Sequence, residues 1–307
     1  MARHFAVRGI DVFGVGRNPP KPEPLWLFPP GYRYFRAHIG DQTDRVLSIL
    51  DDERPDVVLN IAAQGEGAAS FGEHAWRFYQ TNVVYLVQLV EQLRRREYLR
   101  RFIQISTSEL YGSCAQPVSE DAPLRPTSPY AISKAAFDQH LQVLHRVHGF
   151  AMNIVRPSNC LTAGMQLHRV VPRAAISAIY GQRMQLQGGG EARKSFLDTE
   201  DLARAVLAAL DKGAVGEIYN AGPQEPTSIR EIVRIVGECA GVPMAGFVDE
   251  VPGRVGEDSV YWLESGRLRA LGWAPTVPLE RAIESIVSWV RDHPALAEMP
   301  WKYEVAP

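Results

Sequence analysis

Apolar runs and amphipathic segments alternate along the first half of the chain, and this alternation predicts an α/β fold. Short apolar runs predict strands, and segments with helical periodicity predict the helices between them. The strand runs are apolar throughout, as in parallel strands that helices cover on both faces. The predicted strands cover residues 11–15, 56–61, 101–106 and 151–155, and the predicted helices cover residues 42–53, 73–97 and 128–148. The pattern therefore predicts a doubly wound parallel sheet.

The rhythm loosens after residue 157, where the predicted strands become short. Helices are predicted over residues 170–180, 200–210, 228–240 and 278–291. We therefore predict a sheet domain over residues 1–157 and a smaller C-terminal part over residues 158–307, some of whose segments return to the sheet. This second part is expected to lie over the carboxyl edge of the sheet, where open α/β sheets bind their ligands.

The composition is that of an ordinary globular protein and narrows the possible functions. The 307 residues include 33 Lys and Arg against 35 Asp and Glu, a formal net charge of −2. This balance argues against a nucleic-acid partner, and no apolar run has the length of a membrane span or a signal peptide. Three widely spaced cysteines, Cys114, Cys160 and Cys239, predict unpaired thiols and a cytoplasmic location.

Tyr130 and Lys134 are the first candidates for chemistry. Their i,i+4 spacing on a predicted helix puts the phenol and the ammonium on one face. A nearby ammonium lowers the pKa of a phenol, and a Tyr tuned in this way exchanges protons with a sugar or alcohol hydroxyl near neutral pH. An isolated pair with this spacing is common by chance and is then usually part of a solvated helix face.

A polar segment follows the strand predicted at residues 101–106. Thr107, Ser108 and Glu109 lie there, at the carboxyl end of a parallel strand, where an active site is expected. Thr107 is suited to hydrogen-bond a substrate hydroxyl, and Glu109 is a candidate acid or base. The alternative is a strand-to-loop turn with polar caps. We favour the site because Tyr130 and Lys134 follow at a suitable distance.

Two other groups are weaker candidates. His140, His145 and His148 are spaced like metal ligands, but no set of Cys or carboxylate residues completes a site, and we predict no metal. Cys160 lies near the predicted site without an evident His partner, so we expect a packed residue rather than a nucleophile.

Several motifs resemble those of a known family. In chain order they are NIAAQ at residues 60–64, TNV at 81–83, STSELYG at 106–112, SPYAISK at 128–134, RPSN at 156–159, KSFLDTED at 194–201, YNAG at 219–222 and LGW at 271–273. Over nearly the whole chain they resemble the extended short-chain dehydrogenase/reductases of the NAD-dependent epimerase/dehydratase family, which act on nucleotide sugars. STSELYG and SPYAISK look most like the 4,6-dehydratases of GDP-mannose and dTDP-glucose.

This resemblance implies a Rossmann-like NAD(P)-binding domain, a nucleotide-sugar substrate and a homodimer built on the two long helices. Val83, Leu86, Val87, Val90 and Leu93 form an apolar stripe at helical spacing that either faces the partner subunit or faces the sheet. The implied cofactor-binding residues are Arg17, Asn18, Asp41, Gln42, Ala62, Ala63, Gln64, Asn82, Tyr130, Lys134 and Pro157. The implied substrate-binding residues are Asn159, Arg193, Lys194 and Arg254, and whether Arg193 or Lys194 contacts the diphosphate is left open. The RPSN motif, which includes Arg156, resembles a segment that reaches the nicotinamide and the substrate phosphate.

For a 4,6-dehydratase the resemblance also implies a role for each catalytic candidate. Tyr130 takes the 4-hydroxyl proton, Thr107 holds that hydroxyl, and Lys134 binds the ribose and polarises Tyr130. Glu109 takes the C5 proton, and it would serve in both steps if Ser108 is too weak an acid. The alternatives are an epimerase or 4-keto reductase, in which Glu109 is a bystander, and a non-catalytic remnant that binds nucleotide sugars.

The glycine-rich turn of dinucleotide-binding folds is not found. Such folds place G-x-G-x-x-G or a related motif between the first strand and the first helix, where it binds the pyrophosphate. This sequence instead resembles the family from within that first helix onward. The first strand is central in the strand order of the fold, so its loss would leave two unpaired edges inside the sheet. Either the true start lies upstream, which we favour, or the chain is a remnant with impaired cofactor binding.

The residues after the strand at 11–15 bear on the choice of cofactor. Enzymes that use NAD place an acid there for the ribose 2′-hydroxyl, whereas an Arg accommodates a 2′-phosphate. The sequence has Arg17 and Asn18 and no acid at this point. We therefore expect NAD or NADP, with NADP slightly favoured.

Overall fold

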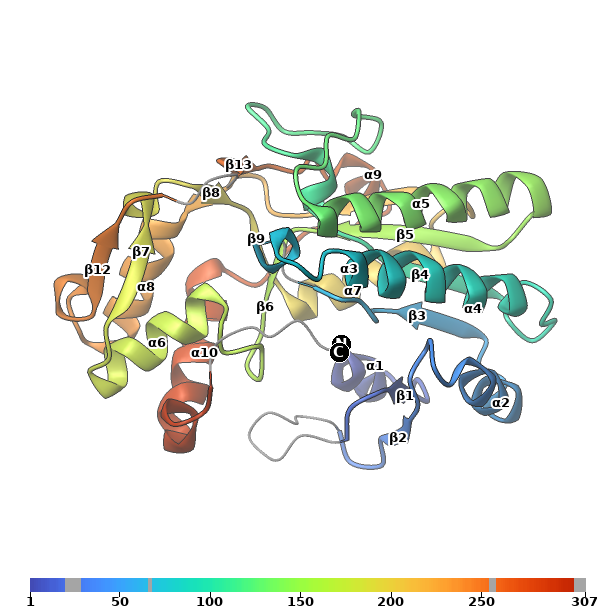
Figure 1. The fold of residues 1–307 in the computed structure, drawn as a ribbon, viewed down its shortest axis with the longest axis horizontal. Coiled ribbons are helices and arrows are strands. Elements are labelled where there is room, and N and C mark those ends of the chain that lie inside the picture. Colours follow the sequence, from blue (N-terminus) through green and yellow to red (C-terminus); the bar gives the residue numbers. More distant parts are fainter. Residues whose placement is uncertain (20–28, 66–67, 254–257, 301–307) are drawn as a thin grey trace.

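A parallel four-stranded sheet forms the centre of the larger part of the molecule. The computed structural model describes residues 1–19, 29–65, 68–253 and 258–300 (Figure 1). In spatial order the strands are β10 (Ile218–Ala221), β5 (Met152–Pro157), β4 (Arg101–Ile105) and β3 (Val57–Asn60), all parallel. Helices cover both faces, so the predicted Rossmann-like α/β fold is confirmed.

Each face of this sheet has its own apolar core, because successive side chains of a strand point to opposite faces. Phe102 and Ile154 pack with α2 (Thr43–Glu53), α4 (Leu86–Leu93) and α5 (Pro129–His148) on one face. Ile103 and Val155 pack on the other face with α1 (Ala2–Val7), α7 (Thr199–Asp211) and α9 (Gly266–Ala270). α7, α9 and β10 all come from the second half of the sequence, so segments after residue 157 return to the sheet.

Two further strands form a separate small sheet. β1 (Phe13–Gly16) and β2 (Arg33–Arg36) pair in parallel with each other. Among the described residues neither pairs with β3, and β3 pairs only with β4. The sequence predicts that β1 and β3 do not pair with a common strand between them, because the central strand of the fold is not found in the sequence. Proline-rich residues 20–28, predicted as a loop, lie outside the described residues.

The helix predicted over residues 73–97 is interrupted in the structure. It consists of α3 (Trp76–Tyr79), a π-helical stretch η2 (Gln80–Tyr85) and α4, which ends at Leu93. Asn82 lies fully buried within the π-helical stretch. Because π-helical turns inside α-helices often mark functional sites, this departure from the predicted regular helix is itself informative.

The remaining elements form a second part at one end of the molecule (Figure 1). α6 (Val170–Tyr180), α8 (Ile229–Ala240) and α10 (Leu279–Asp292) pack together beside the pair β7 (Met184–Gln187) and β12 (Val248–Val251). The boundary predicted at residue 157 stays a prediction. The short ladders are β6 (Asn159–Leu161) with β9 (Phe196–Asp198), and β11 (Thr227–Ser228), β8 (Arg193–Lys194) and β13 (Val260–Tyr261). The short helices are η1 (Ala68–Phe71), η3 (Ser108–Tyr111), η4 (Gly188–Gly190), η5 (Met244–Gly246) and η6 (Pro294–Ala297).

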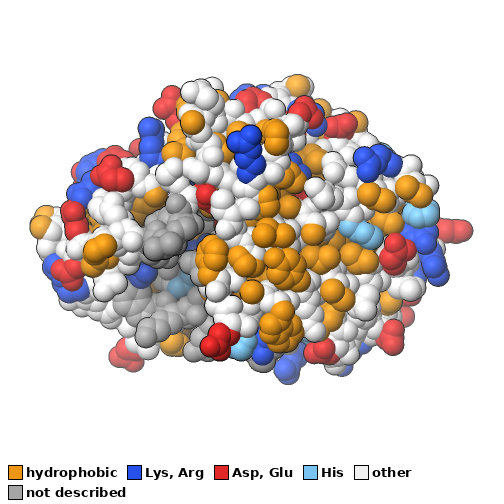
Figure 2. All heavy atoms as spheres, turned by 45° about the horizontal axis from the view of Figure 1, so that its top comes forward, with side chains coloured by type: hydrophobic (Ala, Val, Ile, Leu, Met, Phe, Trp, Pro, Cys, Tyr) orange, Lys and Arg blue, Asp and Glu red, His pale blue; other side chains and the backbone are white. Residues whose placement is uncertain are grey.

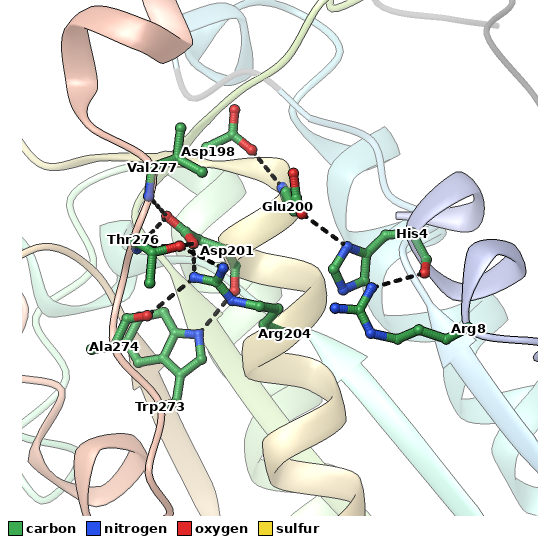
Figure 3. Close-up of polar contacts among 10 residues, drawn as sticks. All are labelled: His4, Arg8, Asp198, Glu200, Asp201, Arg204, Trp273, Ala274, Thr276 and Val277. Carbon is green, nitrogen blue, oxygen red and sulfur yellow. Dashed lines mark hydrogen bonds and ion pairs between the residues drawn. The ribbon is translucent and has the colours of Figure 1, made fainter.

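The start of α7 connects the two parts (Figure 3). Asp201 is fully buried and accepts hydrogen bonds from the backbone N–H groups of Thr276 at 3.1 Å and Val277 at 3.0 Å. These bonds hold the segment that leads into α10. Glu200 contacts His4 at 3.5 Å and so ties α1 to the same turn. Among the described residues no helix is long and apolar enough to cross a membrane.

Candidate active site

The polar segment that follows β4 lies at the carboxyl end of the sheet, as predicted. Thr107 caps the short helix η3, and its Oγ1 accepts a hydrogen bond of 3.2 Å from the N–H of Glu109. Thr107 and Ser108 are buried, whereas Glu109 is half-buried. The cap fixes the direction in which the chain leaves the strand, and it places Glu109 in the first turn after the strand end.

Helix α5 brings Tyr130 and Lys134 to the same strand end. The Ser128 side chain caps the helix by accepting from the N–H of Ala131 at 3.1 Å, with Pro129 in the first turn. Lys134 is 2% exposed, and its Nζ donates to the carbonyl oxygen of Ile105 at 2.8 Å. Since Ile105 is the last residue of β4, this bond joins the helix to the segment that carries Thr107 and Glu109.

The environment of Lys134 tunes its charge. Burial lowers the pKa of Lys134 to about 8, and the Asp138 carboxylate one turn further along α5 opposes that fall. Tyr130 is half-buried, with its ring edge-on to Phe78 at a centroid distance of 6.4 Å. The pair therefore has the elements of a proton-exchanging site, a phenol with an ammonium one turn away.

The segment after β3 lies next to this helix. Gln64 donates its backbone N–H to Asn82 Oδ1 at 2.8 Å, and Asn82 Nδ2 donates to the Gln64 carbonyl at 3.0 Å and to Ser133 Oγ at 2.9 Å. Ala62 and Ala63 are exposed at this edge. The π-helical stretch thus presents Asn82 to both the strand end and α5, so the structure brings these four cofactor candidates beside the catalytic ones.

The candidates for the adenosine end follow β1 and β2. Tyr34 Oη donates to the Asn18 carbonyl at 2.7 Å, and Arg36 Nε donates to the Arg17 carbonyl at 3.1 Å. After β2, the N–H of Asp41 donates to His38 Nδ1 at 3.0 Å, and Gln42 Oε1 accepts from the N–H of His38 at 3.1 Å. Sequence reasoning did not include Arg36. Its place at the end of β2, beside Arg17, was the available signal.

The substrate candidates lie on the ladders that face this edge. Pro157 ends β5 and Asn159 begins β6. Lys194 is buried, and its Nζ lies 3.7 Å from the centroid of the Tyr261 ring and donates to the Asp258 carbonyl. Arg193 is exposed and donates to the Pro226 carbonyl at 3.0 Å. Arg254 lies outside the described residues.

Arg156, the first residue of the RPSN motif, is buried behind the strand ends. It is 2% exposed, and its guanidinium donates to Asp138 Oδ2 at 3.0 Å and to Tyr111 Oη at 2.8 Å. Tyr111 in turn donates to Asn220 Oδ1 at 2.9 Å. The side chain therefore belongs to a buried polar network behind the strand ends.

This constellation coincides with a family match. The sequence profile described as "NAD dependent epimerase/dehydratase family" matches residues 1–222. The chain belongs to this family. The matched residues include β3 to β5, α5 and the strand-end segment, so the family accounts for the whole constellation around Tyr130 and Lys134.

Among curated proteins, this family member is similar to dTDP-glucose 4,6-dehydratases. It is 32% identical over 266 residues to dTDP-D-glucose 4,6-dehydratase of Mus musculus, which covers 85% of the chain and 74% of that protein. It is 33% identical over 266 residues to dTDP-glucose 4,6-dehydratase of Streptomyces griseus, which covers 86% of the chain and 79% of that protein.

Solved structures of the family show the same fold. The dTDP-glucose 4,6-dehydratase DesIV of Streptomyces venezuelae, solved with NAD and TYD bound, has a TM-score of 0.78 at 28% identity, covering 86% of this chain and 81% of that one. The UDP-glucose 4-epimerase of Thermus thermophilus, solved with NAD, has a TM-score of 0.84 at 27% identity, covering 94% and 93%. The chain therefore has the fold of both dehydratases and epimerases.

Proposed function

We propose that the protein is a nucleotide-sugar 4,6-dehydratase, which converts an NDP-hexose to an NDP-4-keto-6-deoxyhexose. One observation carries the proposal: the Lys134–Ile105 bond of 2.8 Å holds the Tyr130–Lys134 helix against the strand end that carries Thr107 and Glu109. A 4,6-dehydratase needs an acid or base for C5 and C6 besides the Tyr that acts at C4, and we assign this role to Glu109. Similarity to 4,6-dehydratases at about 30% identity supports the same reaction.

In this proposal each side chain moves or holds one proton. Tyr130 removes the proton of the sugar 4-hydroxyl while Thr107 hydrogen-bonds that hydroxyl, and the Lys134 ammonium stabilises the phenolate. Glu109 then takes the proton from C5, which the 4-keto group has made acidic, and returns a proton so that the 6-hydroxyl leaves as water. Ser108 is buried and less acidic, so Glu109 serves in both steps. A bound nicotinamide cofactor would supply the two-electron redox chemistry for oxidation at C4 and reduction at C6.

The residues present fit the nicotinamide and ribose part of such a cofactor better than its pyrophosphate. Lys134 and Tyr130 would hold the ribose, and Asn82 fixes the Gln64 backbone beside it. Arg17 and Arg36 would donate hydrogen bonds to a 2′-phosphate, and for this reason we propose NADP over NAD. No glycine-rich turn for the pyrophosphate is found in the sequence given. A non-catalytic protein that binds nucleotide sugars is a further alternative.

An epimerase or 4-keto reductase is the second candidate function. The structural likeness to the Thermus thermophilus UDP-glucose 4-epimerase over 94% of the chain favours it. Both reactions use Tyr130 at C4, but only the dehydratase needs Glu109. A substitution of Glu109 therefore distinguishes the two candidate functions.

The test is Glu109→Gln, assayed with GDP-, dTDP- and UDP-hexoses. We expect the 4-keto-6-deoxy product to fall by about 100-fold or more, while oxidation at C4, followed as reduced nicotinamide at 340 nm, persists. Glu97→Gln is the matched control, because Glu97 is exposed in the turn between α4 and β4. Full product formation by the Glu109 variant would remove the dehydratase proposal and favour the epimerase.

We also propose that the protein is a homodimer, through a surface different from the predicted stripe. Leu86, Val90 and Leu93 are fully buried against the sheet, so they are not available to a partner. Five apolar side chains instead remain exposed on α3, η2 and α5, and a broad apolar area covers this side of the molecule (Figure 2). This apolar face consists of Trp76, Val84, Ile132, Val143 and Val147. A cytoplasmic location remains part of the proposal and is supported by three free cysteines.

A further inference from the structure

A buried charged cluster lies directly behind the candidate active site. Asp138 follows Lys134 by one turn of α5 and is fully buried. Its Oδ2 accepts from Ser106 Oγ at 2.8 Å and from Arg156 Nε at 3.0 Å. Ser106 leads from β4 into the catalytic segment, and Arg156 lies on β5. The carboxylate therefore touches both strands whose ends form the site.

The hydrogen bonds of Asp138 indicate an ionised carboxylate. Both donors are on Oδ2, whereas Oδ1 is buried and has no hydrogen-bond partner among the described residues. The Arg156 guanidinium on Oδ2, at 3.0 Å, favours the ionised form of this carboxylate. Burial raises the pKa of Asp138, and the Arg156 guanidinium opposes that rise.

Lys134 is the cation that this carboxylate faces along the helix. Its Nζ is occupied by a neutral acceptor, the Ile105 carbonyl, and its side chain is 2% exposed. The other titratable or charged groups at this strand end are Tyr130 on α5, Glu109 and Tyr111 on η3, and Arg156 on β5. Asp138 is the fully buried carboxylate of this set, whereas Glu109 is half-buried. The charge of Asp138 opposes the effect of burial on the ammonium.

We propose that Asp138 is a positioning residue that keeps the buried Lys134 ammonium charged in the active site, with Ser106 and Arg156 holding its carboxylate in place. Lys134 in its charged form is what stabilises the Tyr130 phenolate, so the effect of Asp138 reaches the chemistry through Lys134. The inference rests on the proposed function for its consequence in catalysis, but the charge of Lys134 is measurable without any substrate.

The test is a direct titration of Lys134. The chain has five lysines, so selective ¹³Cε-lysine labelling gives few NMR signals, and Lys134→Met identifies the one to follow. In Asp138→Asn the pKa of Lys134 should fall by about one pH unit or more from its value near 8. In Arg156→Gln the pKa should rise, because the cation that offsets Asp138 is removed.

The direction of the shift separates this role from a structural one. A variant that merely loosens the core lets water reach Lys134, and its pKa then moves up toward 10.5, opposite to the fall expected for Asp138→Asn. Asp52→Asn, an exposed residue on α2, should leave the pKa unchanged. If Asp138→Asn is too unstable to titrate, Ser106→Ala carries the test. It removes the Ser106 bond to Asp138 Oδ2 and should lower the pKa of Lys134 by a smaller amount, whereas a loosened core would raise it.

The pH dependence of the activity is a second test of the role of Asp138. With an active substrate, the alkaline limb of the pH–rate profile for C4 oxidation should move to lower pH in Asp138→Asn by the same amount as the pKa of Lys134. An unchanged pKa of Lys134 in both Asp138→Asn and Arg156→Gln would overturn the inference. If no nucleotide sugar is converted but the pKa falls, the proposed function fails while the assignment of Asp138 stands.

Discussion

Arg17 and Arg36 lie side by side after β1 and β2, and among the described residues neither has an acidic partner. The Arg36 Nε–Arg17 carbonyl bond of 3.1 Å joins the ends of the two strands where the adenosine site is predicted. Two uncompensated cations at this point favour a ligand with an extra phosphate. NAD carries a neutral 2′-hydroxyl in place of this phosphate, so the two arginines would make no comparable contact with it.

We therefore expect the Arg17→Ala/Arg36→Ala variant to lose about 10- to 100-fold in affinity for NADP and at most about twofold for NAD. Isothermal titration calorimetry with both dinucleotides measures this difference. Arg33→Ala is the control, because Arg33 lies on the same strand but pairs with Asp11 at 3.0 Å and with Glu53. Equal losses for the two dinucleotides would contradict the preference for NADP.

At the scale of residues, the sequence predicts which side chains meet when they are close in the sequence or follow directly on a predicted strand. Tyr130 and Lys134 are one helical turn apart, and Thr107 follows the carboxyl end of a parallel strand. The fold therefore brings the helix and this strand end together. The network of Asp138 and Arg156 depends instead on two elements that pack across the sheet. An Asp on the buried side of a predicted helix, one turn after Lys134, was the signal that sequence reasoning did not use.

Among the elements, α5 shows how one helix faces three environments. Its buried face packs on the sheet through Phe137 and Leu141, its first turn presents Tyr130, and its outer face exposes Val143 and Val147. Val143 is 45% and Val147 66% exposed, and both belong to the apolar face shown in Figure 2. An apolar stripe of this kind on a polar protein is a typical association surface.

The dimer proposal is tested by Val143→Glu/Val147→Glu. Each Glu would be solvated in a monomer but buried without a partner in a dimer, so we expect the variant to be monomeric while keeping its unfolding midpoint. Light scattering after size-exclusion chromatography gives the mass. Val215→Glu serves as the control, since Val215 is exposed to a similar degree, 42%, outside the apolar face. A variant that remains dimeric would show that the subunits meet elsewhere.

Helix boundaries and regular periodicity were predictable, but the interruption between α3 and α4 was not. The apolar residues of positions 73–97 follow a continuous helical period. A π-helical turn shifts this period too little to be recognised in the sequence. The insertion follows from tertiary contacts, because Asn82 satisfies the Gln64 backbone from within it. The resemblance drew attention to Asn82 through the TNV motif, whereas the geometry that makes Asn82 useful came only with the structure.

In the whole molecule, the interrupted sheet separates a well-paired region from a poorly paired one. β4 and β5 each have a neighbour on both sides, and their side chains are almost all buried. β1 pairs on one side only, and all its residues are partly exposed. The β1–β2 pair is held mainly by side chains such as Phe13 and Val15, which pack at the margin of the core on the α2 face. The two regions should therefore differ in local stability.

Native-state hydrogen exchange followed by mass spectrometry tests this difference. We expect amides of β4 and β5 to exchange only by global unfolding, and those of β1 and β2 to open with a free energy lower by at least about 2 kcal/mol, because fewer ladder bonds and less buried area hold them. NADP should protect β1 and β2 selectively if Arg17 and Arg36 bind its 2′-phosphate, since a ligand that binds only the closed form stabilises that form. Uniform protection of both regions in the free protein would mean that side-chain packing alone couples the two sheets into one cooperative unit.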